Sequence, residues 1–101
     1  MTISPKDLKQ VVVFQRATDE DLDLILKNSI LRSIEEGSFF FMQGDEAKHL
    51  YILASGQAKL TQSNINGQQV NLRTIYPWQM FGALGATRDG VATYPATAQA
   101  L

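Results

Sequence analysis

The chain contains no cysteine, and this absence excludes several kinds of structure and chemistry. Disulfides, thiolate zinc sites, iron–sulfur clusters and cysteine nucleophiles all need the thiol. The chain also has a single histidine, His49, which is too few for a metal site built from several imidazoles. The Gly-x-Ser-x-Gly, Walker and dinucleotide-binding glycine motifs are missing as well. These absences together indicate a protein that is not an enzyme.

Charge of one sign and long apolar runs are also scarce. Nine basic and ten acidic side chains give a formal net charge of −1, so no strong overall field attracts nucleic acid or anionic lipid. Apolar runs such as residues 11–14 are much shorter than the roughly 20 residues of a membrane span. Residues 1–7 lack the apolar segment of a secretory signal. We therefore expect a cytoplasmic protein without membrane contact.

Two helix signals open the chain. Ser4 precedes Pro5, and proline at the first helical position loses an N–H that would be unpaired in any case. Thr18 precedes residues 19–21, which place three carboxylates in a first helical turn, where the helix dipole favours negative charge. Thr18 and Asp21 also have the spacing of a capping box. The predicted helices cover residues 5–12 and 18–28.

From residue 30 onward, the pattern is that of short strands separated by turn residues. Asn66-Gly67, flanked by alternating apolar and polar residues, predicts a hairpin with a type I′ turn, which needs positive φ at both central residues. The predicted strands cover residues 30–35, 38–42, 50–54, 57–63, 68–75 and 93–101, and residues 81–87 are predicted as a short helix.

These elements predict a mainly β fold, an antiparallel β-roll of the double-stranded β-helix or jelly-roll kind with two short N-terminal helices. The length of 101 residues supports one domain, which we divide into a helical cap (1–29) and a β-roll (30–101). Because the chain ends close to where the roll would be completed, we expect an exposed sheet edge. Such edges pair readily with another chain, so a homo-oligomer stays open as an alternative.

The order of elements resembles the cyclic-nucleotide-binding, effector domain of CRP/FNR transcription regulators over residues 8–101. The resemblance depends on residues 37–45, residues 50–60, the Asn66-Gly67 hairpin, and Phe81-Gly82 with the small residues that follow. It implies a ligand-sensing regulatory domain with a small-molecule effector. It also implies that DNA is bound by a C-terminal helix-turn-helix. No such segment is present in residues 1–101, so we expect this fragment itself neither to bind DNA nor to form the family's usual dimer.

In the family that the chain resembles, a phosphate-binding cassette presents backbone N–H groups of a short helix to a cyclic phosphate. The corresponding residues here are Gly82, Ala83, Leu84, Gly85, Ala86, Tyr94, Pro95 and Ala96. Members that bind cAMP have Glu where Ala83 stands, and Arg followed by Ser or Thr where Tyr94 and Pro95 stand. Tyrosine is uncharged at neutral pH and proline has no N–H. The resemblance therefore implies a degenerate site that does not bind cAMP.

Two alternatives remain open beside this interpretation. The Tyr-Pro-Ala-Thr-Ala sequence beginning at Tyr94 also resembles superfamily members that regulate nitrogen-oxide and anaerobic metabolism, some of them with haem. A haem- or nitric-oxide-sensing domain would use His49 as the candidate iron ligand, with Met80 or Met42 as its partner. The third hypothesis is a structural β-roll that binds no small molecule. Arg88 is interpreted as a solvated loop charge, and no other metal site is expected.

Overall fold

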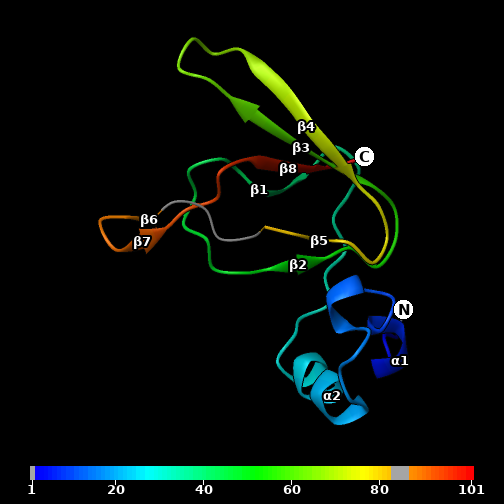
Figure 1. The fold of residues 1–101 in the computed structure, drawn as a ribbon. Helices are drawn as coiled ribbons and strands as arrows, with labels where there is room; N and C mark the ends of the chain where they lie inside the picture. The colour runs from blue at the N-terminus through cyan, green and yellow to red at the C-terminus, as the bar shows by residue number, and fades with distance from the viewer. Residues whose placement is uncertain (1, 83–86) are drawn as a thin grey trace. The chain divides into compact units, whose positions relative to one another are not determined.

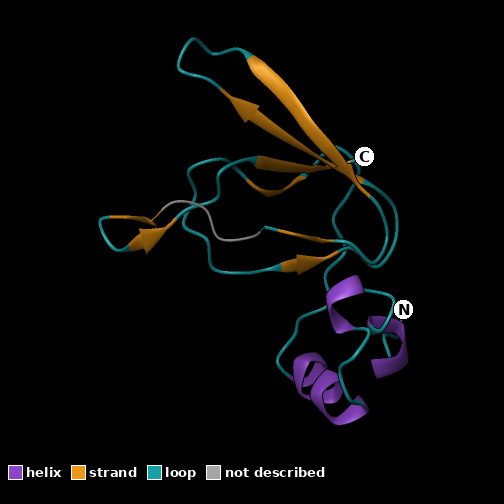
Figure 2. Ribbon diagram, viewed as in Figure 1, coloured by secondary structure: helices purple, strands orange, loops and turns teal. Residues whose placement is uncertain are grey.

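A computed structural model describes residues 2–82 and 87–101, and their helices and strands lie in separate parts of the chain (Figures 1 and 2). One compact unit, Met1–Ser33, contains the described helices, and a second, Ile34–Leu101, contains the described strands. In the described residues, no helix combines the length and the apolar character that crossing a membrane requires. That the two units act as one domain stays a prediction.

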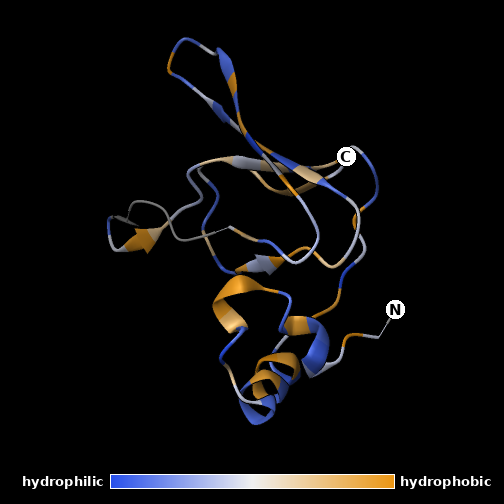
Figure 3. Ribbon diagram, turned by 45° about the vertical axis from the view of Figure 1, so that its right-hand side comes forward, coloured by the Kyte–Doolittle hydropathy of each residue, from blue (hydrophilic) through white to orange (hydrophobic). Residues whose placement is uncertain are grey.

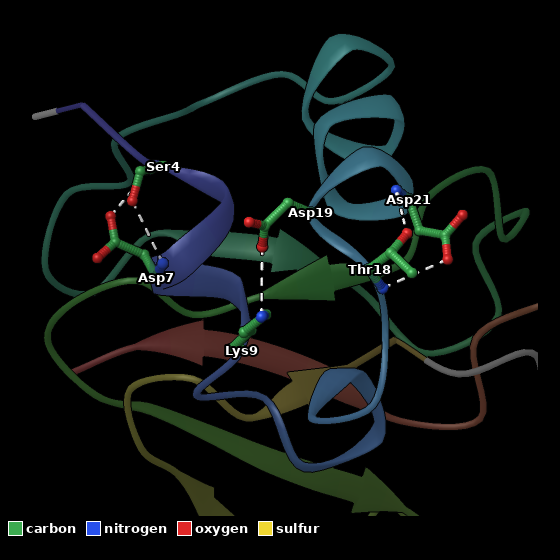
Figure 4. A network of polar contacts seen from close by, with 6 residues as sticks. All are labelled: Ser4, Asp7, Lys9, Thr18, Asp19 and Asp21. Atoms are coloured by element: carbon green, nitrogen blue, oxygen red, sulfur yellow. Dashed lines mark hydrogen bonds and ion pairs between the residues drawn. The ribbon is translucent and has the colours of Figure 1, made fainter.

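The first helix, α1 (Pro5–Leu8), begins where the sequence predicts but ends earlier. The Ser4 hydroxyl accepts a hydrogen bond from the Asp7 N–H at 3.3 Å, and the Asp7 carboxylate accepts one from the Ser4 N–H at 2.9 Å (Figure 4). The predicted end near residue 12 is wrong, because Val11 is extended and a separate 3₁₀ turn, η1 (Val12–Phe14), follows. Valine loses side-chain freedom in a helix, so a run of valines favours this exit.

The second helix, α2 (Asp19–Lys27), confirms its predicted start and ends within one residue of its predicted end. The Thr18 hydroxyl accepts a hydrogen bond from the Asp21 N–H at 3.1 Å, which completes the expected capping box (Figure 4). Apolar and charged residues alternate around the helix (Figure 3). Leu22, on the apolar side, is completely buried. The amphipathic pattern therefore forms the packed helix that it predicts.

All strand pairs among the described residues are antiparallel. The largest sheet has the order β1-β8-β3-β4, and two smaller sheets consist of β2 with β5 and β6 with β7 (Figure 1). The strands are β1 (Phe39–Phe41), β2 (Tyr51–Ile52), β3 (Ala58–Ser63), β4 (Gln69–Ile75), β5 (Met80–Phe81), β6 (Thr87–Arg88), β7 (Val91–Ala92) and β8 (Thr97–Ala100). This arrangement confirms the predicted mainly β, antiparallel fold.

Three predicted elements differ from the structure. The strand predicted over residues 30–35 is wrong, because this segment is irregular and Ile30 is 71% exposed, with no neighbouring strand to pair with. The helix predicted over residues 81–87 is wrong at both ends, which belong to β5 and β6, while residues 83–86 lie outside the described part. Arg88 lies in β6 rather than in a loop, since its backbone pairs with Val91.

The predicted type I′ turn occurs at a different hairpin. Among described non-glycine residues, positive φ is found only at Trp78 and Asp89, so Asn66 does not have the required conformation. Between β6 and β7, Asp89 (φ 52°) and Gly90 (φ 80°) form a two-residue loop with both angles positive, as type I′ requires. Between β3 and β4, a five-residue loop begins with a turn in which the Gly67 N–H donates to the carbonyl of Asn64 at 3.0 Å.

The hydrophobic core of the second unit gathers side chains from several strands. Phe40, Tyr51 and Leu60 pack against it from partly buried positions. Its buried members are Phe41, Leu53, Ala58, Ile75, Phe81, Tyr94 and Ala98. Toward its loop, the β3–β4 hairpin extends away from the other strands (Figure 1), and Val70 and Leu72 are exposed there. The core therefore lies at the end of the sheet that is nearer to β5.

Candidate functional site

Four of the eight predicted site residues lie in the described part of the chain. Gly82 follows β5 directly, and the other three form the segment before β8. These three are Tyr94, Pro95 and Ala96. The middle of the predicted cassette, Ala83, Leu84, Gly85 and Ala86, lies outside the described residues. The described geometry of the site is therefore that of its two flanks.

The Tyr94 hydroxyl is bonded to both backbone groups of one residue. It donates to the His49 carbonyl oxygen at 2.7 Å and accepts from the His49 N–H at 3.1 Å. Tyr94 is 4% exposed, so these bonds form in a place with little access to water. A phenol has one donor hydrogen, which the His49 carbonyl takes. The side chain at the position where the resemblance implies an arginine thus makes its hydrogen bonds within the protein.

The Tyr94 ring is also part of the core. It stacks on the Phe41 ring with centroids 3.9 Å apart and planes 15° from parallel. Its backbone joins the turn after β1, where the Tyr94 N–H donates to the Asp45 carbonyl and the Tyr94 carbonyl accepts from the Gly44 N–H, both at 2.9 Å. Ring, hydroxyl and backbone therefore hold the side chain in one place.

Gly82 occupies a crowded position with a backbone conformation that favours glycine. Its φ is +80°, and an added Cβ would lie 3.0 Å from Tyr51 Cδ2, 3.2 Å from Phe41 Cε2 and 3.4 Å from the His49 carbonyl oxygen. Gly82 thus lies close to two core side chains and to the backbone of His49. Gly82 and Tyr94 share Phe41 and the His49 carbonyl as neighbours, so the structure brings these two predicted residues together.

Pro95 and Ala96 have different surroundings. Pro95 is exposed, and its carbonyl accepts a hydrogen bond from Gln62 Nε2 at 2.9 Å. Ala96 is buried, with 5% of its surface exposed. Neither side chain carries a charge or a donor that would recognise an anion. This segment connects Tyr94 to β8 and offers no side-chain substitute for the expected hydroxyl.

Arg73, a cation that was not among the predicted site residues, lies near β5. Arg73, in β4, donates from Nη2 to the Met80 carbonyl at 3.2 Å, two residues before Gly82. The hairpin pairing of β3 with β4 and the turn after β4 bring this side chain to the start of β5. The alternating polarity of the β4 sequence indicated that Arg73 points away from the core. It did not indicate which group Arg73 contacts.

His49, the candidate haem ligand, lies in the irregular segment before β2 and is exposed. Its imidazole is oriented edge-on to the Tyr51 ring, with centroids 6.4 Å apart. The backbone of His49 is held by the Tyr94 hydroxyl, while its imidazole lies against the Tyr51 ring. Within the described residues, no group of three or more histidine, aspartate and glutamate side chains is arranged to hold a metal ion.

Comparison with known proteins identifies the family. Residues 31–101 match the family model described as the cyclic nucleotide-binding domain. The chain belongs to this family. Among curated proteins, the Cyclic AMP receptor protein of Thermus thermophilus is 30% identical over 91 residues, which are 90% of this chain and 42% of the relative. This cyclic nucleotide-binding-like domain therefore spans less than half the length of that relative.

Solved structures agree with this assignment. The sensor domain of the transcriptional regulator DNR from Pseudomonas aeruginosa superposes with a TM-score of 0.80 at 27% identity, covering 94% of this chain and 63% of that one. The Thermus thermophilus Catabolite Activator Protein gives a TM-score of 0.74 at 28% identity, covering 87% and 40%. The resemblance to the CRP/FNR type, inferred from the order of elements, is thus confirmed.

Sequence reasoning missed the partners of Tyr94 in this cyclic nucleotide-binding-like domain. His49 was a candidate site residue because of its imidazole. Its described hydrogen bonds, however, join its backbone to the hydroxyl of Tyr94, 45 positions later in the chain. Nothing in the sequence around Phe41 indicated that its ring stacks on Tyr94. The available signal was the loss of a charged residue at Tyr94 in favour of an aromatic one, a change that often accompanies burial.

Proposed function

We propose that this domain is the effector-sensing part of a CRP/FNR-type transcription regulator and that cAMP is not its effector. The observation that carries the proposal is the position of Tyr94, buried and bonded to the His49 backbone where the resemblance implies an arginine for the phosphate. The names of its relatives, a cyclic AMP receptor protein and the sensor domain of a transcriptional regulator, support the sensory role.

The expected loss of cAMP affinity is large. The family resemblance implies two contacts that this chain lacks, one from the carboxylate replaced by Ala83 and one from the guanidinium replaced by Tyr94. A hydrogen bond to a charged group contributes roughly 1.5–3 kcal/mol. Losing two such bonds weakens binding by about 10²- to 10⁴-fold. A site that binds at micromolar concentrations would then bind at about 0.1 mM or more weakly.

Tyr94 is also a poor candidate to move toward a phosphate. Turning the side chain outward would break both bonds to His49, each contributing about 1 kcal/mol, and the stack on Phe41, worth about another 1 kcal/mol. It would also open the core of the second unit. An uncharged phenol gains too little from a phosphate to offset these losses.

DNA recognition is assigned in this proposal to a part of the regulator outside residues 1–101. The net charge of −1 gives these residues no excess of positive charge for the phosphate backbone. A signal from the effector would therefore reach DNA through another segment, in a longer chain or an assembly.

Isothermal titration calorimetry with cAMP and cGMP tests the proposal directly. We expect no saturable heat at nucleotide concentrations below about 0.1 mM, the affinity expected after loss of both contacts. The Cyclic AMP receptor protein of Thermus thermophilus, measured under the same conditions, is the positive control. Saturable one-to-one binding of cAMP with a dissociation constant near 1 μM would contradict the proposal.

A thermal-shift screen with nucleotides, haem and 2-oxo acids tests the sensory role itself. A molecule that binds the native state raises the melting temperature, by an amount that increases with its concentration. A concentration-dependent rise with one class would identify the effector. An unchanged melting temperature with every class of molecule would favour the structural β-roll that binds no small molecule.

Haem or nitric-oxide sensing is the second candidate function. It is favoured by the exposed imidazole of His49, which lies beside Tyr51 at the edge of the aromatic core. His49, with Met42 or Met80 as its partner, would hold the haem. When bound, haem would supply the gas-binding iron, and His49 would hold and orient it.

A further inference from the structure

The tip of the β3–β4 hairpin contains an exposed asparagine, Asn66, that is followed directly by a glycine. Asn66 is exposed, and it precedes Gly67, whose φ is +79°. A Cβ placed on Gly67 would meet no heavy atom within 4 Å, so the space around this peptide is open. Glycine also leaves its own amide nitrogen unshielded by a side chain. Asn66 therefore lies in an exposed peptide and is followed by a residue without a side chain.

The other three asparagines provide an internal comparison. Asn28 donates from Nδ2 to the Leu24 carbonyl at 2.8 Å, and a serine follows it. Asn64 accepts at Oδ1 from two backbone N–H groups at 2.9 Å, and leucine follows Asn71 within the β4 ladder. Among the described residues, Asn66 alone combines a side chain without a hydrogen-bond partner and a following glycine.

We propose that Asn66-Gly67 is a site of spontaneous deamidation and isoaspartate formation. The Gly67 nitrogen, after losing its proton to base, attacks the Asn66 side-chain carbonyl carbon and forms a five-membered succinimide. The bond from that carbon to the side-chain nitrogen breaks, and ammonia leaves with the proton. Water then opens the ring at either carbonyl, giving aspartate or isoaspartate. Water is consumed, ammonia is released, and no oxidant or reductant takes part.

The structure also contains a restraint on this reaction. The Gly67 N–H donates to the Asn64 carbonyl at 3.0 Å, and the Asn64 side chain accepts from the Asn66 and Gln68 N–H groups. Attack requires the loop to open, because the reacting nitrogen is held by this bond. Opening of an exposed loop needs little free energy, so it slows the reaction without preventing it. Removing the Asn64 side chain should therefore accelerate reaction at Asn66.

The modification changes both charge and geometry at the hairpin tip. A neutral amide becomes a carboxylate, which takes the formal net charge of the chain from −1 to −2. Isoaspartate also adds a methylene group to the main chain between residues 66 and 67. This extra atom disrupts the bonds from the Asn64 side chain to the Asn66 and Gln68 N–H groups. The loop is therefore expected to lose order in the aged protein.

Peptide mapping of the aged full chain tests the proposal. Trypsin releases residues 60–73 as one peptide that contains Asn64, Asn66 and Asn71. After incubation at 37 °C, we expect a gain of about 1 Da that fragmentation assigns to Asn66 before either neighbour. The rate should rise with pH by about tenfold per unit, because the deprotonated fraction of a very weak acid rises in this way. Isoaspartate is detected with an isoaspartyl methyltransferase.

Three variants keep the test falsifiable. Asn66→Gln should remove the early mass gain. Asn64→Ala should increase the rate of deamidation at Asn66 at least twofold. Asn71→Ala, a control in the same peptide, should leave the rate at Asn66 unchanged. Equal rates at Asn66 and Asn71 in the natural chain, or no mass gain at all, would overturn the site. An unchanged rate in Asn64→Ala would overturn the restraint.

Discussion

Replacing Tyr94 by phenylalanine isolates the contribution of one hydroxyl to the stability of this domain. The substitution keeps the ring and its stack on Phe41 but removes the bond to the His49 carbonyl and the bond from the His49 N–H. Both backbone groups then lose their partner at once. Tyr94→Phe therefore tests whether the Tyr94 hydroxyl stabilises the folded domain, as the proposed function requires.

The expected destabilisation is about 1–2 kcal/mol. A single hydrogen bond contributes about 1 kcal/mol net, and a buried polar group left unpaired is destabilised by about 1–3 kcal/mol. Because His49 is itself exposed, water can reach its backbone after a small movement, so the lower part of that range applies. For a domain of this size, 1 kcal/mol corresponds to a change of about 4–8 °C in melting temperature.

Urea unfolding followed by circular dichroism measures this difference. We expect a lower midpoint with an unchanged slope, because the surface exposed on unfolding stays the same. Tyr76→Phe is the matched control, since Tyr76 is 50% exposed and a surface change of this kind is usually within about 0.5 kcal/mol of neutral. Equal midpoints for the two variants would refute the reasoning and leave Tyr94 free to serve a ligand.

The remaining predictions concern a glycine, a helix cap and the candidate haem ligand. In urea unfolding, Gly82→Ala should destabilise the domain by about 1–3 kcal/mol more than Gly56→Ala does. Both glycines have positive φ (80° and 77°), but of the two only Gly82 is crowded. Equal losses of unfolding free energy would show that the neighbours of Gly82 move aside. Thr18→Ala should lower the stability of α2 by about 1 kcal/mol and reduce the hydrogen-exchange protection of the Asp21 amide; unchanged protection would contradict the cap. If haem binds, its Soret band should shift in His49→Ala, and an unaffected band would exclude His49 as the ligand.

Local signals in the sequence predicted the elements that are stabilised locally. The starts of α1 and α2 follow from capping boxes whose residues lie three positions apart, so the sequence contains the whole interaction. The β3–β4 hairpin was predicted for a similar reason, because its alternating strands flank a turn sequence. The predicted strand over residues 30–35 failed because a strand needs a partner, and its apolar residues gave no information about one.

The two glycine turns show how a short sequence pattern misleads. Asn66-Gly67 and Asp89-Gly90 both have residue types that suit a type I′ turn, yet only the second adopts it. At the first, the Asn64 side chain accepts from the Asn66 and Gln68 N–H groups, which favours a longer loop. Side-chain bonds to nearby backbone thus compete with the tight turn. The choice depends on a residue outside the dipeptide.

The family resemblance led to Tyr94 as a candidate site residue, and its place beside a phosphate stays a prediction. Chemistry alone showed that the uncharged side chain of Tyr94 could not replace a cation. Its role as a core residue depends on Phe41 and His49, which lie 53 and 45 positions earlier in the chain. Stability and anion binding compete for this position. An arginine placed here would lose the stack on Phe41 and put a charge at a position that is only 4% exposed. Under the proposed function, an arginine at position 94 would therefore create a cAMP site only together with changes in the core around it.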